Sequence, residues 1–179
     1  MRSPTPKYSY HKWRKDHGGA MVEFAIVLPL LLILVFGIIE FGILFYNKSV
    51  LANASREGAR MGIIEIYDNN GTPTDGSDDK YYYPDKPDIA SVVINYCSDH
   101  LISFSPNPEI DENNINVSWT IPPDGVSERT YPDVFSGDFL TVTVNYNYEF
   151  LIFSKLIKLV AGQDWGNISL KGETVMKLE

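Results

Sequence analysis

The chain has 179 residues, of which 44% are hydrophobic and 21% are charged, and its formal net charge is −8. This length suits a single domain, and the composition is that of a folded protein rather than a disordered one. The charge is unevenly placed, because residues 1–18 carry a net charge of +4 and the remainder therefore carries −12. Since an acidic body repels phosphates, the charge pattern argues against nucleic acid as a partner.

Cysteine and histidine are too scarce for most metal and catalytic sites. The single Cys97 excludes an internal disulfide framework and a cysteine-cluster metal site. His11 and His17 precede the apolar part of the chain, so a histidine-based site would depend on His100 alone. The sequence also lacks GxGxxG, GxxxxGK[ST], HExxH, GxSxG and CxxC motifs. We therefore expect no catalytic residues, no cofactor site, no metal site and no enzymatic activity.

The apolar block covers residues 24–46, FAIVLPLLLILVFGIIEFGILFY, and holds one charged residue, Glu40. As a helix, 23 residues span about 35 Å, whereas the hydrocarbon core of a bilayer is about 30 Å thick. The block predicts a single membrane span, because the later stretch LIFSKLIKLV at 151–160 is short and contains two lysines. The lysines and arginines that precede the block predict a cytoplasmic N-terminus and an external C-terminal body.

A cleaved secretory signal is the competing interpretation of this block. Ala52-Asn53-Ala54 supplies an A-x-A sequence after it. However, the apolar run is longer than the 7–15 residues typical of a signal peptide, and it ends well before that sequence. We therefore favour a membrane anchor.

The junction before the block reads HGGAMVEFA, with glycine at 18 and 19 and an acid at 23. Glycine has no side chain, so the backbone at Gly18-Gly19 can enter a narrow protease groove, although a flexible hinge would use the same residues. A carboxylate at the start of a membrane helix is costly unless it is paired. A newly cut α-amino group would neutralise Glu23. The alternative is an acid that reaches the water at the membrane surface.

These features together resemble the TadE-like family, the minor pilins (pseudopilins) of the Tad tight-adherence pilus, which have a type IV prepilin-like N-terminus. The resemblance covers residues 14–64 and rests on GGAMVEFA, the leucine-rich run with Pro29, GIIEFG at 37–42 and ASREGARMG at 54–62. It implies that a prepilin peptidase cuts between Gly18 and Gly19. It also implies that Glu23 pairs with the N-terminal amine of an adjoining subunit and so sets the subunit register.

The same resemblance implies the partners and the role of the protein. The partners would be the prepilin peptidase, other Tad pilins and pseudopilins, the Tad membrane assembly platform and its cytoplasmic ATPase. The role would be that of a structural or assembly subunit of a pilus used in adhesion and surface attachment.

Glu40 and a set of small residues are the next candidates for contacts. Glu40 either reaches water beyond the bilayer or pairs with a partner subunit. After the block, Ala54, Gly58 and Gly62 recur at four-residue spacing, which lets another helix or surface approach closely. That neighbour is either another subunit or the protein's own outer domain.

Residues 68–87 are rich in turn-forming and acidic residues and predict a long exposed loop. Asp68, Asp75, Asp78 and Asp79 could attract calcium. An EF-hand loop counted from Asp68 would need glycine and glutamate where Pro73 and Asp79 stand, so the calcium motif fails.

The rest of the body predicts a helix from about 88 to 101, capped by Asp88, and strands at 115–121, 139–150 and 168–179. The segment 122–133 predicts a second loop, and the aromatic face of the 139–150 strand is expected to lie in the core. The predicted fold class is α+β: a long N-terminal transmembrane helix that continues outside the membrane, then a small domain with one further helix and an antiparallel sheet of three or more strands.

The sequence thus predicts a basic cytoplasmic leader at 1–18, a transmembrane and extended helix at 19–64, and an extracytoplasmic domain at 65–179. The leading functional hypothesis is a TadE-like minor pilin that is processed by a prepilin peptidase. The alternative is an uncleaved, single-pass membrane protein that displays a ligand-binding outer domain. The mature N-terminus separates the two.

Overall fold

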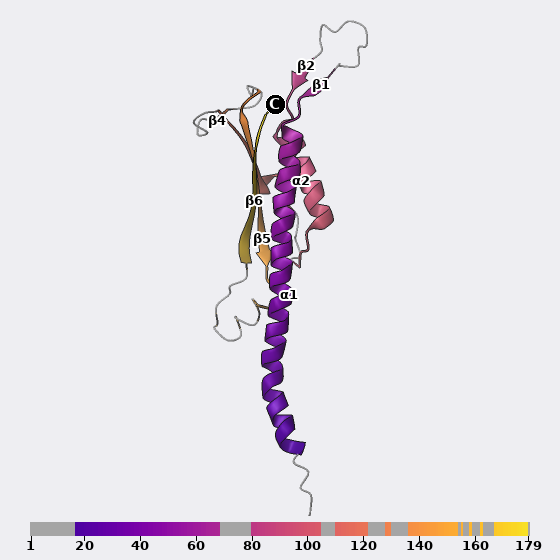
Figure 1. Cartoon of the computed structure of the whole chain (residues 1–179), viewed down its shortest axis with the longest axis vertical. Helices are drawn as coiled ribbons and strands as arrows, with labels where there is room; N and C mark the ends of the chain where they lie inside the picture. The colour runs from indigo at the N-terminus through magenta and orange to yellow at the C-terminus, as the bar shows by residue number, and fades with distance from the viewer. Residues whose placement is uncertain are drawn as a thin grey trace, which may run out of the picture. The chain divides into compact units, whose positions relative to one another are not determined.

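The computed structural model describes residues 17–68, 80–104, 110–121, 128–129, 136–153, 155, 158, 162 and 167–178. The chain divides into two compact units, Met1–Gly37 and Ile38–Glu179. Figure 1 shows the elements in chain order. They are α1 His17–Gly62, β1 Ile66–Asp68, β2 Lys80–Tyr82, α2 Lys86–His100, the 3-10 turn η1 Glu112–Asn114, β3 Ile115–Thr120, β4 Glu128–Arg129, β5 Phe139–Glu149 and β6 Asn167–Lys177.

The long helix α1 accounts for the apolar block and for the polar stretch that follows it. It runs for 46 residues and contains Pro29. Proline is tolerated inside membrane helices, where neighbouring groups satisfy the carbonyl that it leaves free. Within the first unit, the large apolar side chains of α1 are exposed, except that of Leu28, which is partly buried. The second unit contains the part of α1 from Ile38 onward, and there one face is buried.

The second helix begins earlier than the sequence predicted. α2 starts at Lys86, and its N-cap is Asp85, not Asp88. The Asp85 side chain accepts a hydrogen bond of 3.0 Å from the Asp88 N–H. Pro87 belongs in the first turn, where its missing N–H costs nothing. Asp88 therefore lies inside the first turn, where its negative charge interacts favourably with the positive end of the helix dipole.

The predicted antiparallel sheet is confirmed, and with it the α+β fold. Its strand order is β4-β3-β5-β6, and every neighbouring pair is antiparallel. Along β5 the side chains of the predicted inner face are buried, from Leu140 to Tyr148. The register pairs Val117 with Val142 and Val144 with Gly172, so β5 is the central strand along most of its length.

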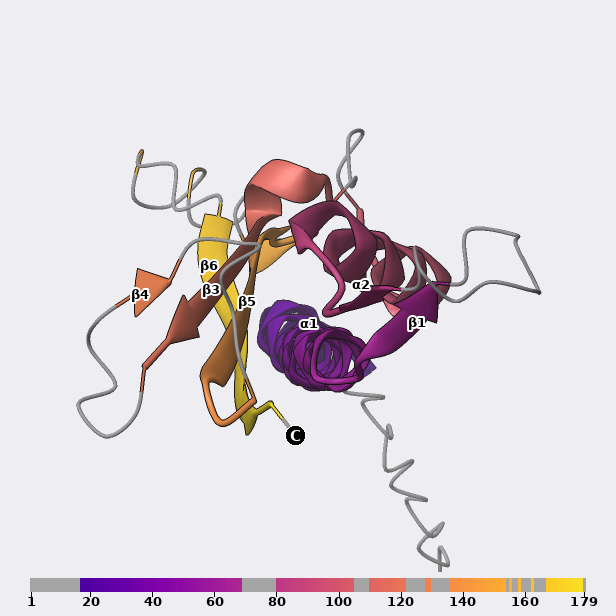
Figure 2. The same ribbon diagram turned by 90° about the horizontal axis from the view of Figure 1, so that it is seen from above.

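The core of the second unit forms where α1 and α2 meet the sheet, as Figure 2 shows from above. The core combines Leu51 and Ala54 of α1 with Ile89 and Val93 of α2 and the inward residues of β3, β5 and β6. Burial of this apolar surface is the main free-energy gain for a domain of this size. The long helix is thus a structural member of the α+β domain as well as the candidate membrane span.

The predicted loop at 68–87 is wrong at both ends, because residue 68 belongs to β1 and residues 80–82 and 86–87 belong to β2 and α2. β1 and β2 form a two-stranded antiparallel ladder in which Ile66 pairs with Tyr82 and Asp68 with Lys80. Tyr83 and Pro84 then enter the core before α2 begins. The backbone hydrogen bonds of the ladder satisfy groups that an open loop would leave to water. The calcium candidates Asp75, Asp78 and Asp79 lie outside the described residues, and no cluster of metal-binding side chains occurs within them.

The second predicted loop, at 122–133, contains the short strand β4, which pairs Trp119 with Arg129. The remainder of that loop lies outside the described residues.

Candidate functional site

The predicted cleavage junction lies in the first turns of α1. Gly18, Gly19 and Glu23 are all exposed, and a Cβ added at either glycine would meet no atom within 4 Å. Each glycine weakens a helix by about 1 kcal/mol relative to alanine, so this end opens more easily than the apolar turns that follow. Glu23 is four residues after Gly19, and residues at this spacing lie on one helix face. A new amine at Gly19 would therefore be one turn from the carboxylate.

The apolar part of α1 is suited to a membrane. Within the described residues, α1 is the one helix long and apolar enough to cross a bilayer. Its most apolar 18-residue window has a mean hydropathy of 2.9, and 6% of that window is buried by the protein itself. A core helix of a soluble protein would be mostly covered, whereas this one leaves its side chains open on nearly every side.

Glu40 adopts neither of the two arrangements predicted from the sequence. Its side chain is 4% exposed, and each of its carboxylate oxygens accepts one backbone hydrogen bond of 3.1 Å. The donors are the N–H groups of Ile152 and Phe153, which follow the end of β5. The Phe41 ring meets the Phe153 ring edge-on, with centroids 6.0 Å apart. Glu40 therefore fastens the chain's own 150–153 segment to α1 instead of reaching water or another subunit.

Substitution of Glu40 by glutamine tests this contact. Gln has one acceptor oxygen, so one of the two N–H groups of Ile152 and Phe153 would face an amide nitrogen. We expect a local loss of about 1.5–3 kcal/mol, the usual contribution of a hydrogen bond to a charged group. The hydrogen-exchange rates of the Ile152 and Phe153 amides should increase at least about tenfold. NMR of the protein in detergent measures these rates.

The control for this variant is Glu57→Gln on the same helix. Glu57 is a solvent-facing carboxylate whose pKa is lowered mainly by a hydrogen bond from Arg60, at 2.7 Å in the shorter contact. This substitution should leave the 152 and 153 amides unchanged. Equal protection of those amides in Glu40→Gln and the parent protein would refute the role of Glu40.

The small residues of α1 pack inside the domain. A Cβ on Gly58 would lie 2.5 Å from Val93 Cγ2, and one on Gly62 would meet Leu140 and Ile89. Ala54 is fully buried. Of the two neighbours that the sequence left open, the structure shows the protein's own α2 and β5 against this face.

The sequence interpretation missed Asn47, a fully buried residue on the same side of α1. Its Nδ2 donates to the Ile102 carbonyl at 2.6 Å, and its Oδ1 accepts from the Ile102 N–H at 3.0 Å. The side chain thus pairs with both backbone groups of one residue and fixes the chain just beyond α2. The available signal was the seven-residue spacing from Glu40, which places the two polar residues on one helix face.

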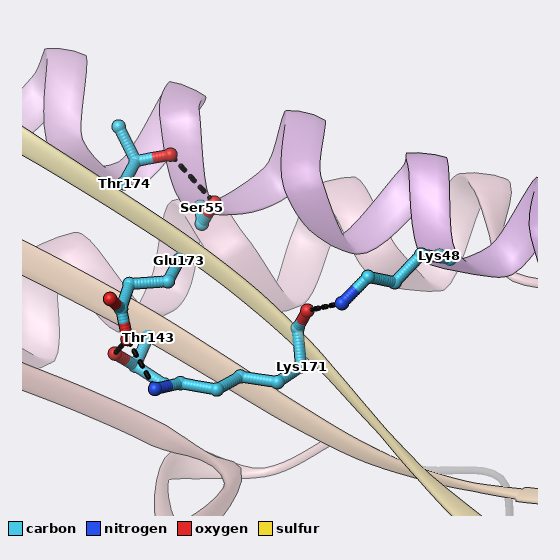
Figure 3. A network of polar contacts seen from close by, with 6 residues as sticks. All are labelled: Lys48, Ser55, Thr143, Lys171, Glu173 and Thr174. Carbon is cyan, nitrogen blue, oxygen red and sulfur yellow. Dashed lines mark hydrogen bonds and ion pairs between the residues drawn. The ribbon is translucent and has the colours of Figure 1, made fainter.

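A second missed contact lies between α1 and β6 (Figure 3). Lys48 Nζ donates to the Lys171 carbonyl oxygen, and the hydroxyls of Ser55 and Thr174 are 2.8 Å apart. Between them, Gly172 faces the backbone of α1, and a Cβ there would collide with the Leu51 carbonyl. A lone glycine inside a strand pattern is the sequence signal for such a close backbone approach.

A comparison with known protein families found a match that lies within α1. A protein-family model described as TadE-like protein matches residues 18–60. The predicted TadE-like segment is confirmed. The match begins at the first glycine of the junction and ends two residues before α1 does. Searches of the curated proteins and of the solved structures found no match to the chain.

The similarity to the TadE-like family is confined to residues 18–60, which is less than half of the 179-residue chain. The matched segment contains Glu23, Glu40 and Asn47. It ends before β1, and the remainder of the α+β domain lies outside the match.

Proposed function

We propose that this TadE-like chain is a minor pilin or pseudopilin, a structural or assembly subunit of a Tad pilus that serves adhesion and surface attachment. In this proposal, α1 anchors the chain in the cytoplasmic membrane and the α+β domain lies outside. The observation that carries it is the coincidence of the family match with a helix whose apolar side chains are open on nearly every side. The partners would be other Tad pilins and the membrane assembly platform.

The proposal includes removal of residues 1–18 by a prepilin peptidase. The exposed glycines at 18 and 19 present a backbone without side chains to the protease, at the end of α1 that opens most easily. The new N-terminus would be Gly19, and its amine would lie near Glu23 of the same or a neighbouring subunit. Partner pilins would then be aligned along the fibre by this ion pair.

Leader removal is tested by Gly18→Ala. Coexpression with the cognate prepilin peptidase should shorten the parent chain by 18 residues, and Gly18→Ala should stay at full length because the methyl group obstructs the protease groove. Intact mass of the membrane-extracted protein gives the answer. Gly42→Ala is the matched control, since Gly42 is also a helical glycine with no atom within 4 Å of an added Cβ.

Two results would contradict leader removal at Gly18. A mature chain beginning at Ser55 would favour a secretory signal. Retention of Met1 in assembled pili would favour the uncleaved anchor that displays a ligand-binding domain.

The orientation of the chain is tested by cysteine labelling. Cys97 cannot serve as the reporter, because it is 1% exposed and burial raises the pKa of its thiol to about 11. In a Cys97→Ala background, Lys177→Cys should react with a membrane-impermeant maleimide in intact cells with a permeable outer layer. Ser3→Cys in the leader should react only after the inner membrane is broken. The reverse pattern would overturn the proposed orientation.

A further inference from the structure

Around Glu40, most of the circumference of α1 carries exposed apolar side chains. Ile38, Ile39, Phe41 and Phe45 are 66%, 52%, 47% and 68% exposed, while Glu40 is 4% exposed. The exception is the face of α1 that the 150–153 segment covers through its hydrogen bonds to Glu40. A membrane around this level of α1 would therefore touch the 150–153 segment as well.

The position of this level along the apolar block places it at a membrane boundary. The 23 residues of the block span about 35 Å as a helix, against about 30 Å of hydrocarbon core. Glu40 precedes the end of the block at Tyr46 by six residues, or about 9 Å of helix. Ile152 and Phe153 are hydrogen-bonded to Glu40, so they lie at the same height along α1 as Glu40. In the proposed anchoring, this height is on the side of the membrane that bears the domain.

The bonded groups also explain how a carboxylate and a turn can coexist at that depth. An unpaired backbone N–H or a lone carboxylate in hydrocarbon costs several kcal/mol. The Glu40 oxygens satisfy two N–H groups of the turn, and those two donors replace water around the carboxylate. Each group removes the desolvation cost of the other, and this arrangement is favourable where water is scarce.

The chemistry of the adjoining residues is that of a membrane surface. Leu151 is 41% exposed, and Phe153 is half-buried beside Phe41. Lys155 and Lys158 follow, both exposed in helical conformation and three residues apart. Apolar side chains followed by lysines suit a segment that places its apolar part among acyl chains and its ammonium groups among anionic headgroups. These two cations are also a basic site in an otherwise acidic body.

We propose that residues 150–153 with Lys155 and Lys158 form a second membrane contact, which lies in the headgroup region of an anionic bilayer beside α1. The inference rests on the proposed anchoring by α1. The bilayer is chosen over a protein partner because the segment continues the apolar surface of the membrane helix. The contact would hold the domain at a fixed height above the bilayer until the subunit leaves it.

Fluorescence quenching in reconstituted vesicles tests the contact. The full-length Cys97→Ala protein receives an environment-sensitive fluorophore at Leu151→Cys, Phe45→Cys or Lys177→Cys. The vesicles contain phosphatidylcholine and phosphatidylglycerol with nitroxide-labelled acyl chains. Labels at 151 and 45 should be quenched at least about threefold more strongly than the label at 177, which stands at the opposite end of β6 and pairs there with Phe139.

The charge of the contact is tested by the double variant Lys155→Glu, Lys158→Glu with the label at 151. The ratio of membrane-bound to free segment should fall by at least about fivefold for each lysine replaced, because each basic group near an anionic surface contributes about that factor and the new carboxylates are repelled by the headgroups. The double variant Lys86→Glu, Lys177→Glu is charge-matched and uses exposed lysines elsewhere on the domain, so it should leave quenching unchanged.

Quenching at 45 without quenching at 151 would overturn the second contact and leave the anchor intact. Absence of quenching at both positions would overturn the anchor and the contact together. Concentration-dependent cross-linking of 151 between chains, with no quenching by lipid, would replace the bilayer by a second subunit.

Discussion

The Glu23→Gln variant is expected to be inserted and cleaved nearly normally but to lose its pilin partners. In the proposed function, the protease would need Gly18 and access to the junction, whereas Glu23 would act only after the Gly19 amine is free. Glu23 is exposed on α1, and within the described residues its side chain makes no hydrogen bond or ion pair. Its charge is therefore available to a neighbouring subunit, in keeping with the role that we propose.

The expected effect of this substitution is large. Loss of one member of a poorly solvated ion pair costs about 3–5 kcal/mol, because the other charge is left unpaired. This corresponds to a decrease of about 150-fold to 4,000-fold in affinity for the partner. A pull-down of the partner pilins, run beside a leader-cleavage blot, measures both steps.

A charge-retaining variant and one possible outcome help to interpret the Glu23 experiment. Glu23→Asp keeps the charge one methylene further back and should retain part of the partner recovery. Normal partner recovery with Glu23→Gln would show that this carboxylate does not set the register, and would strengthen the alternative of an uncleaved anchor. Glu40→Gln is not expected to act on partner binding directly, because both Glu40 oxygens accept hydrogen bonds from the chain's own backbone.

The second large effect is expected for Gly172→Ala. An added Cβ would collide with the Leu51 carbonyl oxygen and lie 2.5 Å from the Leu51 carbonyl carbon and 2.9 Å from the Ala52 nitrogen. These are backbone atoms of a helix and cannot turn away as a side chain can. We expect a destabilisation of about 3 kcal/mol, the upper part of the usual range for overpacking. For a chain of this length, the midpoint of thermal unfolding should fall by roughly 6–12 °C.

The measurement is tryptophan fluorescence during thermal unfolding of the full-length protein in detergent. Ser169→Ala, on an exposed position of the same strand, should change stability by less than about 0.5 kcal/mol. Gly62→Ala should be milder than Gly172→Ala, because its new methyl group meets the ends of the Leu140 and Ile89 side chains and gains helix propensity. An unchanged midpoint for Gly172→Ala would contradict the close approach of β6 to α1.

A drop in the midpoint for Gly62→Ala in the monomeric protein would place the function of this glycine inside the domain. A loss confined to assembly would instead favour a contact with another subunit. The two results separate the neighbours that the four-residue spacing of Ala54, Gly58 and Gly62 could not distinguish.

The sequence alone determined those features that depend on local order. The apolar block forms α1 because a helix satisfies its own backbone within four residues, and apolar composition decides which solvent it suits. Alternation from Leu140 to Tyr148 predicted β5, because successive side chains of a strand point to opposite faces. The TadE-like segment was likewise readable from the glycines at 18 and 19 and the acid at 23.

Only the tertiary structure decided the partners of the polar and small residues on α1. Glu40 meets donors 112 and 113 positions away, and Asn47 meets a residue 55 positions away. Gly172 lies against a carbonyl of Leu51, which belongs to a different element. The helical spacing shows that these side chains share faces of α1, but it holds no information on which distant segment covers each face. That choice depends on the packing of the whole domain, in which each buried polar group must find a partner and each close backbone approach must exclude a side chain.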